Sequence, residues 1–367
     1  MKPKLRFNEF NDEWNKVKIS SIVQELKIKT GNTEKYPLWS LTIENGVTPK
    51  TDRYERSFLV KKDDNYKIVE PNNYVYNPMN AHLGAIARNK SNTTISVSGY
   101  YDIFKINNKN YSFYDNYFVS PVMFKQYKLI STGSLLEKQR VHYSQFKELE
   151  INLPTNKEQV KISNFLSLLD KKIELQSKKI EDLKLFKKGL TNNIFSNLNV
   201  IKEEKLGNIC NITTGKLNAN AMVENGQYRF YTCAKDFYYI DKYAFDTEAL
   251  LISGNGAYVG YIHYYKGKFN AYQRTYVLNQ FKSNIQYIKI YLDSFLSKRI
   301  NSEKKEGNTP YIVLSTLSDM TIKLTDSKSE EIIINCINSI NSKIKKEELK
   351  LNKLNELKKG LMQNMFV

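Results

Sequence analysis

The apolar pattern between Lys157 and Ser196 predicts one long amphipathic helix. From Ile162 onward its apolar residues recur at alternating steps of four and three, which is the a/d spacing of a coiled-coil seam. Two polar residues, Gln176 and Lys187, interrupt this seam. At ~1.5 Å per residue, the helix measures roughly 55–60 Å. A helix of this kind cannot bury its seam alone, so the pattern predicts a partner helix.

The partner is predicted within the same chain, because residues 328–367 repeat the pattern. A shift of 171 residues aligns the two stretches without a gap and places Glu347 on Gln176 and Lys358 on Lys187. Both copies also end in Lys-Lys-Gly-Leu. Shared polar breaks favour an internal duplication over two unrelated lysine-rich helices. The predicted helix interface consists of Ile162, Leu166, Leu169, Ile173, Gln176, Ile180, Leu183, Leu190, Ile333, Ile337, Ile340, Ile344, Glu347, Leu351, Leu354 and Leu361.

The duplication extends upstream of the helices and predicts the domain organisation. By the same shift, Val141 falls on Ile312 and Ile151 on Ile322, and similarity then becomes gapped. We therefore predict an α+β protein in which a pseudo-two-fold duplication gives two mixed domains and two long helices. The predicted boundaries are 1–154 for the first domain, 155–196 for the first helix, 197–327 for the second domain and 328–367 for the second helix.

A glycine-containing stretch in the second domain predicts a hairpin. Leu251 to Ile262 is interpreted as a strand, a glycine turn and a second strand, and Tyr76 to Ala87 is its predicted counterpart. Gly254, Gly256 and Gly260 superficially resemble a nucleotide loop. No helix is expected after them, so the dinucleotide interpretation fails and a turn is favoured.

The charge of the chain favours an extended polyanion as its partner. The formal net charge is +18 and the sequence pI is about 9.4, and the positive excess is spread over both domains and both helices. A spread of this kind suits nucleic acid better than a small acidic ligand. A general lysine bias in composition is the alternative explanation. Aromatic content of 13% indicates a chain that folds.

Candidate DNA contacts are polar and aromatic residues near predicted turns. Arginine and glutamine side chains suit guanine and adenine edges, and lysines suit phosphates. For each single residue, an ordinary solvated position is the competing interpretation. The candidates are Arg88, Lys90, Tyr100, Lys138, Gln139, Arg140, Asn255, Tyr258, Gln273, Arg274, Lys304 and Lys305.

No catalytic or metal-binding motif stands out in the sequence, although Asp and Lys are frequent enough to leave a nuclease-type carboxylate pair open. Its three cysteines and three histidines are scattered, without metal-ligand spacing, and an odd cysteine count argues against a disulfide framework. No Asp/Asn-Pro-Pro-Tyr/Phe methyltransferase motif and no helicase phosphate loop occur. We expect no signal peptide and no membrane span, hence a cytoplasmic protein.

The order of domain, heptad helix, domain, heptad helix resembles the specificity subunit of type I restriction–modification systems. The resemblance covers the whole chain. It includes the Gly-Asn-Gly-Ala-Tyr-Val-Gly-Tyr-Ile stretch from Gly254, the Ile-Asn-Leu-Pro strand from Ile151 that enters a helix, and the Lys-Lys-Gly-Leu helix ends. Its motifs are individually loose, and no base contact carries over because recognition domains of the family vary widely.

The resemblance implies a non-catalytic subunit that reads double-stranded DNA. Each domain would recognise one half of a split, asymmetric target, and the helices would pair antiparallel and act as a ruler. Two methyltransferase (modification) subunits would dock on the helices, and restriction/translocase subunits would then join. The chain would hold no cofactor, since S-adenosylmethionine, ATP and Mg would sit on those partners. The alternative from another class is a coiled-coil assembly protein whose two domains bind protein or glycan.

Overall fold

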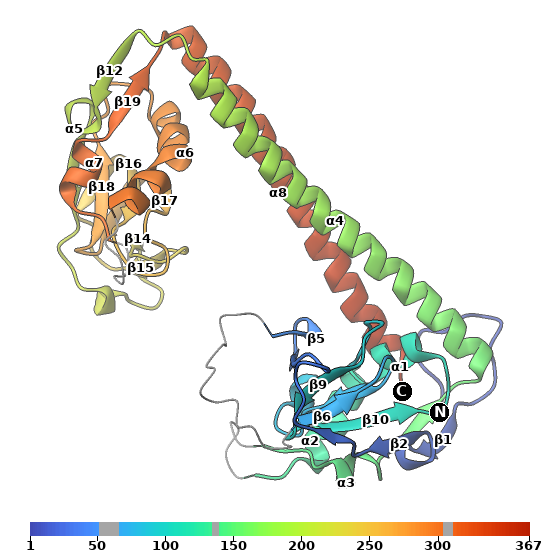
Figure 1. Cartoon of the computed structure of the whole chain (residues 1–367). Coiled ribbons are helices and arrows are strands. Elements are labelled where there is room, and N and C mark those ends of the chain that lie inside the picture. The colour runs from blue at the N-terminus through green and yellow to red at the C-terminus, as the bar shows by residue number, and fades with distance from the viewer. Residues whose placement is uncertain (51–65, 134–138, 304–310) are drawn as a thin grey trace. The chain divides into compact units, whose positions relative to one another are not determined.

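A computed structural model describes residues 1–50, 66–133, 139–303 and 311–367. The chain divides into two compact units, one formed by Met1–Gln176 with Lys350–Val367 and the other by Ser177–Leu349. We call them unit 1 and unit 2. Both boundaries fall inside long helices, α4 (Asn156–Ser196) and α8 (Ser327–Met365). Each unit thus combines a globular domain with one stretch of each helix (Figure 1).

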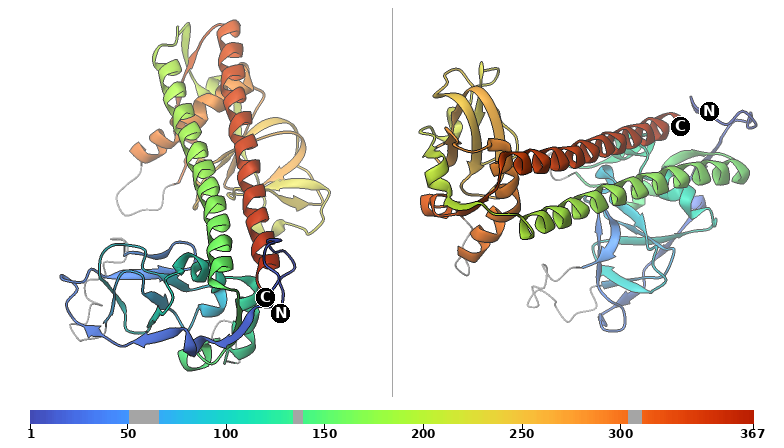
Figure 2. Two further views of the ribbon diagram at one scale, coloured as in Figure 1. Left: turned by 90° about the vertical axis from the view of Figure 1, so that its right-hand side faces the viewer. Right: turned by 90° about the horizontal axis from the view of Figure 1, so that it is seen from above.

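Within each unit the two helix stretches run side by side in opposite directions (Figures 1 and 2). In unit 1, Ile162 and Leu166 near the start of α4 share a core with Met365 near the end of α8. In unit 2, Phe195 at the end of α4 shares a core with Ile333 near the start of α8. The predicted long helices and their pairing within one chain are therefore present.

The two domains share a four-stranded antiparallel arrangement. In unit 1 the order is β2-β10-β7-β8, and in unit 2 it is β13-β18-β16-β17, extended by β14 and β15 to six strands. The strands of unit 1 are β1 (Asn15–Lys18), β2 (Val23–Leu26), β3 (Lys29–Thr30), β4 (Trp39–Thr42), β5 (Gly46–Pro49), β6 (Tyr66–Val69), β7 (Tyr74–Tyr76), β8 (Ile86–Arg88), β9 (Ile95–Ser98), β10 (Asp102–Ile106) and β11 (Glu150–Leu153). Those of unit 2 are β12 (Lys202–Lys205), β13 (Asn211–Thr214), β14 (Tyr228–Tyr231), β15 (Tyr238–Ile240), β16 (Phe245–Ser253), β17 (Ile262–Ala271), β18 (Thr275–Asn279) and β19 (Thr321–Leu324).

Helices cover one face of each main sheet. In unit 2, Leu250 and Ile252 of β16 face the 19-residue helix α6 (Ile285–Glu303), while Leu251 faces a second small core, as strand alternation requires. Both faces of this strand are buried, which explains its continuous apolar run. The helices of unit 1 are η1 (Ile19–Ser21), η4 (Ala81–Leu83), α1 (Tyr111–Tyr117), α2 (Pro121–Ile130) and α3 (Tyr143–Phe146). Those of unit 2 are α5 (Leu206–Ile209), η6 (Ala219–Ala221), α6 (Ile285–Glu303) and α7 (Leu314–Ser318).

The duplication is visible in equivalent backbone contacts at the base of each domain. β1 pairs with β11 and β12 pairs with β19, both antiparallel. The amide of Ile19 donates to the carbonyl of Leu149 at 2.9 Å, and the amide of Leu206 donates to Met320 at 2.9 Å. The partners Leu149 and Met320 are 171 residues apart, as the sequence repeat requires. The two domains therefore meet α4 and α8 through the same framework.

Two apolar segments of unit 1 are each divided between separate elements. The segment Leu83 to Arg88 begins with the end of η4 and a left-handed Gly84 (φ 100°), and only Ile86–Arg88 is extended. The segment Ile95 to Ile106 forms two strands, β9 and β10. The predicted hairpin in unit 2 is correct, because β16 and β17 pair antiparallel on either side of the glycine turn. In the described residues, no helix is long and apolar enough to span a membrane.

Candidate nucleic-acid interface

Two turns of unit 2 meet at one edge of its sheet and bring the predicted residues Asn255, Tyr258, Gln273 and Arg274 together. β16 and β18 pair through Ser253 and Thr275, so the turns that flank these residues are neighbours. The amide of Gly254 donates to the carbonyl of Arg274 at 2.9 Å. A Cβ at position 254 would lie 2.4 Å from that carbonyl oxygen, which explains the glycine.

This edge, which we call the unit 2 edge, presents both aromatic and cationic side chains to solvent. Gln273 and Arg274 are exposed, Tyr258 is 47% exposed and Asn255 is half-buried. Among described residues the Arg274 guanidinium forms no ion pair, so its donors are available to a ligand. Tyr311, which the sequence analysis missed, is 62% exposed and precedes Ile312, whose amide donates to Gly254 at 2.8 Å. The available sequence signal was an aromatic residue that directly follows a basic stretch containing glycine and proline.

Tyr100, Gln139 and Arg140 lie near one another at the corresponding edge of unit 1. Tyr76 pairs with Asp102 across β7 and β10, and the amide of Val141 donates to Pro78 at 2.9 Å, so the three flanking segments converge. Tyr100 is 87% exposed, Arg140 is exposed and Gln139 is half-buried. Met79, also missed from sequence, is 49% exposed on the same turn. We call this group the unit 1 edge.

Arg88 and Lys90 lie away from the unit 1 edge and have a different role. Tyr76 pairs with Ile86 but Tyr74 pairs with Arg88, which puts Arg88 at the opposite end of its strand. Its Nη2 lies 2.9 Å from Asp115 Oδ2, its Nη1 donates to Asn72, and its guanidinium stacks over the ring of Tyr111. The Arg88 side chain is only 14% exposed. Its donors are already occupied, so we assign Arg88 to the stability of unit 1.

Of the four remaining predicted DNA contacts, the structure describes only Lys90. Lys90 is largely exposed and its Nζ lies 3.4 Å from the carboxylate of Asp115 that Arg88 also contacts. Lys138, Lys304 and Lys305 lie outside the described residues. DNA contact by the residues of either edge stays a prediction.

A cation–aromatic cluster in unit 2 was not predicted from the sequence. Arg229 on β14 lies between the rings of Phe237 and Tyr265, with its Cζ at 4.3 Å and 4.6 Å from the two ring centroids. Exposed Tyr238 and Tyr239 follow on β15, the strand at the end of the sheet. Aromatic faces of this kind provide stacking surfaces for cations and bases. The sequence signal was the aromatic density around residues 228–239.

All sixteen predicted seam residues are buried or half-buried along α4 and α8. Fully buried members include the polar Glu347, whose carboxylate lies 3.2 Å from Lys179 Nζ in unit 2. In unit 1, the seam lysine Lys358 lies 2.5 Å from Asp170. Polar seam positions with defined partners fix the register of a helix pair at some cost in stability.

The helices also carry apolar side chains that face away from the seam. Leu168 and Leu185 are both 69% exposed, and Leu175 and Phe186 are more than half exposed, all on α4. The outward side of α4 therefore keeps apolar side chains in contact with solvent after its seam is filled.

No group of three or more His, Cys, Asp or Glu residues that could hold a metal ion occurs among the described residues. Burial raises the pKa of the Cys210 thiol to about 12. A thiol with a pKa this high stays protonated at neutral pH and is a poor nucleophile, since the thiolate is the reactive form.

Comparison with known proteins gives one family. A family model described as the type I restriction modification DNA specificity domain matches residues 11–185 and again residues 201–357. The type I restriction enzyme EcoDI specificity subunit of Escherichia coli is 32% identical over 162 residues, which cover 44% of this chain and 36% of that protein. The alignment thus spans little more than a third of the relative.

Two solved structures share the fold. The S subunit of a type I restriction–modification system from M. genitalium matches with a TM-score of 0.59 at 18% identity, over 100% of this chain and 99% of that chain. A chain from a structure on complex assembly and conformational transition of the type I R-M system matches with a TM-score of 0.62 at 13% identity, over 96% and 97% of the two chains. At these identities the likeness concerns the fold.

Proposed function

The chain belongs to the type I restriction–modification DNA specificity family, and from this membership we propose that it reads a bipartite, asymmetric DNA target. The family recognises DNA sequence and is itself non-catalytic. In the proposed assignment, unit 1 reads one half of the target and unit 2 reads the other half. The duplication of the sheet edge carries the proposal, because each unit has its own edge on the same framework.

The two edges differ in the chemistry they offer, which suits two different half-sites. The unit 2 edge offers Gln273 and Arg274, whose amide and guanidinium groups match adenine and guanine edges in the major groove. The unit 1 edge offers Tyr100 and Arg140, which suit stacking, phosphate or guanine contacts. A framework shared by both units, with different side chains at each edge, lets one half of the target change independently of the other.

Scaffolding of partner subunits is the second part of the proposal. We assign the exposed apolar residues of α4, with Leu168 and Leu185 the most exposed, to the docking of two methyltransferase (modification) subunits. Restriction/translocase subunits then join this core. S-adenosylmethionine, ATP and Mg belong to those partners, and the assembly works on double-stranded DNA in the cytoplasm.

A domain exchange tests the proposal. Residues 1–150 are replaced by the corresponding segment of another family member, and the chimera is assembled with its modification subunits. Sequencing of methylated adenines in cells is expected to show one half of the target changed and the other half unchanged. A change in both halves contradicts the assignment of one half-site to each unit.

DNA affinity gives a second readout of the same assembly. Binding through phosphates releases counterions, so log affinity is expected to fall steeply and linearly with log salt. Salt-independent binding to DNA, or tight binding to protein or glycan alone, would favour the assembly-protein alternative.

A further inference from the structure

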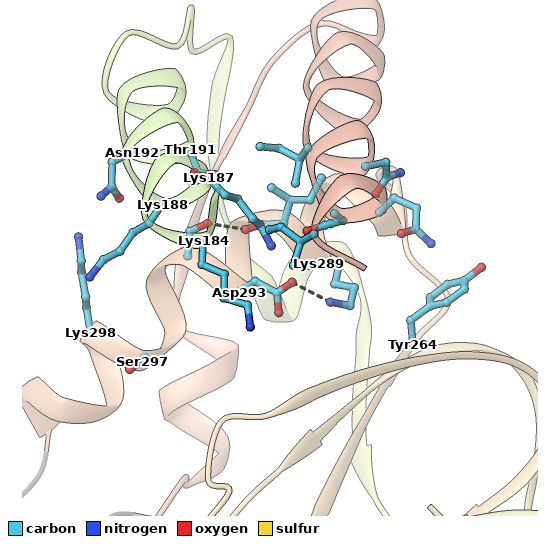
Figure 3. A pocket seen from close by; sticks show the side chains of 17 residues that line it. Lys184, Lys187, Lys188, Thr191, Asn192, Tyr264, Lys289, Asp293, Ser297 and Lys298 are labelled. Atoms are coloured by element: carbon cyan, nitrogen blue, oxygen red, sulfur yellow. Dashed lines mark hydrogen bonds and ion pairs between the residues drawn. The ribbon is translucent and has the colours of Figure 1, made fainter. Parts of the chain in front are cut away.

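Unit 2 contains a cavity of about 650 Å³ between α4, α6 and α8 that the proposed DNA edge does not use (Figure 3). Lys184, Lys187 and Lys188 from α4 line it, together with Lys289 and Lys298 from α6. One carboxylate, Asp293, faces these five lysines. A volume of this size lies within the range of small-molecule sites.

The internal repeat shows that one of these lysines lacks the partner that its equivalent has. In unit 1, Lys358 pairs with Asp170 at 2.5 Å. The shift of 171 residues relates Lys358 to Lys187 and Asp170 to Asn341. Asn341 lines the cavity with Lys187, so an amide stands where the other copy has a carboxylate. The second copy has therefore lost the negative charge that neutralises its seam lysine.

Two of the five lysines are neutralised, and three are not. Lys184 lies 2.6 Å from Glu348, and Lys289 lies 2.7 Å from Asp293. Lys187, Lys188 and Lys298 form no ion pair with any residue in the described part of the chain. Burial lowers the pKa of Lys187, with the charge of Lys289 acting in the same direction and that of Asp293 opposing it. A half-buried cation beside like charges is stabilised when an anion binds.

We propose that this cavity binds the phosphoryl groups of a ligand, held by Lys187, Lys188 and Lys298. Several charges suit a polyphosphate better than a single carboxylate, since each phosphoryl oxygen accepts charge-assisted hydrogen bonds from ammonium groups. The amides of Asn192 and Asn341 line the same space and add neutral donors. The phosphoryl groups come either from the DNA backbone or from a free phosphate-bearing molecule.

The repeat also supplies the test, because Asn341→Asp restores the carboxylate found in unit 1. The complete chain is titrated with sodium tripolyphosphate at low salt by isothermal calorimetry. We expect saturable binding to the wild type and affinity weakened by about tenfold or more in N341D. N341D is also expected to raise the melting temperature, as a new ion pair forms with Lys187, so loss of binding would not reflect unfolding.

Matched variants separate this site from the general positive charge of the chain. Asn352→Asp makes the same change at an exposed position of α8 in unit 1, and we expect it to leave affinity within about twofold. Lys188→Gln is expected to weaken binding several-fold, while its repeat equivalent Lys359→Gln has little effect. Absence of binding to the wild type, or equal weakening by N341D and N352D, overturns the proposal.

Competition with a short DNA duplex identifies the source of the phosphoryl groups. If the duplex displaces tripolyphosphate from the wild-type chain, the cavity takes the DNA backbone. If saturating duplex leaves tripolyphosphate binding unchanged, the cavity takes a free phosphate-bearing molecule. Tripolyphosphate binding does not require recognition of a DNA target. Failure of the cavity proposal and failure of the proposed DNA reading can therefore be distinguished.

Discussion

At the scale of single residues, the partners of a side chain decide its role more than its chemical type does. Arg88 and Arg274 are both arginines next to turns. Arg88 is held by Asp115, Asn72 and the ring of Tyr111, whereas Arg274, among the residues that the structure describes, is held through its backbone carbonyl. Replacing Arg88 is therefore expected to change a different property of the protein from replacing Arg274.

Arg88→Ala is expected to destabilise unit 1, and Arg274→Ala is expected to affect DNA binding. Removing one partner of a partly buried ion pair costs about 1–3 kcal/mol of unfolding free energy. Loss of an exposed arginine changes stability by less than about 0.5 kcal/mol, while loss of a base contact costs about 1–3 kcal/mol of binding. Urea unfolding and DNA titration of the assembled complex measure the two effects. Equal effects of both variants on stability would contradict this division.

Cys210 is expected to be unreactive in the folded protein. Its thiol is buried, and burial raises its pKa to about 12, so the thiolate is scarce at pH 8. Cys233 and Cys336 are partly exposed. We expect iodoacetamide at pH 8 to label those two first and Cys210 only in denaturant, as mass spectrometry of the peptides would show. Rapid native labelling of Cys210 would mean that its environment opens.

At the scale of elements, a buried carboxylate ties the start of the chain to the first turn of α4 in unit 1. Glu158 is 1% exposed and accepts hydrogen bonds from Arg6 Nε at 2.7 Å and Nη2 at 2.8 Å. The indole of Trp14 donates to the same carboxylate at 3.3 Å. The repeat places Ser329 at the equivalent position of α8, so this anchor belongs to one copy only.

Glu158→Gln is expected to cost unit 1 about 3–5 kcal/mol, because the substitution leaves a buried guanidinium without its counter-charge. Replacing both partners, in an Arg6→Met/Glu158→Leu variant, is expected to recover most of that loss, since no charge is then left unpaired. Urea unfolding of both variants gives the comparison. A loss below about 1 kcal/mol in the single variant would show that water compensates the guanidinium.

At the scale of the whole molecule, a shared framework carries two diverged domains. The paired strands at the base, the sheet order and the amide contacts of Ile19 and Leu206 recur in both units. The side chains of the exposed edges differ between the copies, and Asn341 of the lysine cavity stands where unit 1 has Asp170. This division favours function at the edges and structural constraint at the base.

If the helices set the spacing of the half-sites, lengthening both should lengthen the unread spacer. Inserting seven residues after Gln176 and seven after Glu347 preserves the heptad phase and adds about 10 Å to each helix. At ~3.4 Å per base pair, the spacer should grow by about three base pairs with both half-sites unchanged. The methylation motif in cells carrying the variant gives the spacer.

Insertion into α4 alone is the control, and it should reduce stability because the two seams no longer match in length. An active double insertion that keeps the original spacer would show that the domains, not the helices, set the distance.

The sequence by itself determined the features that depend on local periodicity. Steps of four and three define the seam of α4 and α8, and a constant shift relates Gln176 to Glu347, because helix geometry repeats with the chain. The hairpin around Gly254 and Gly260 was also predictable, since turn residues act locally. The family resemblance followed from the order of these elements.

Only the tertiary structure decided features that join distant residues. Helix α6 was not predicted from the sequence. Tyr287, Ile288 and Leu292 of α6 are buried against the sheet and the two long helices, so its apolar residues do not form a single stripe. The engagement of Arg88 depends on Asp115, which is 27 residues away. The cavity around Lys187 needs α6 beside α4 and α8. Hydrophobic periodicity is a property of the chain, whereas the partner of each charge depends on which elements the packed core brings together.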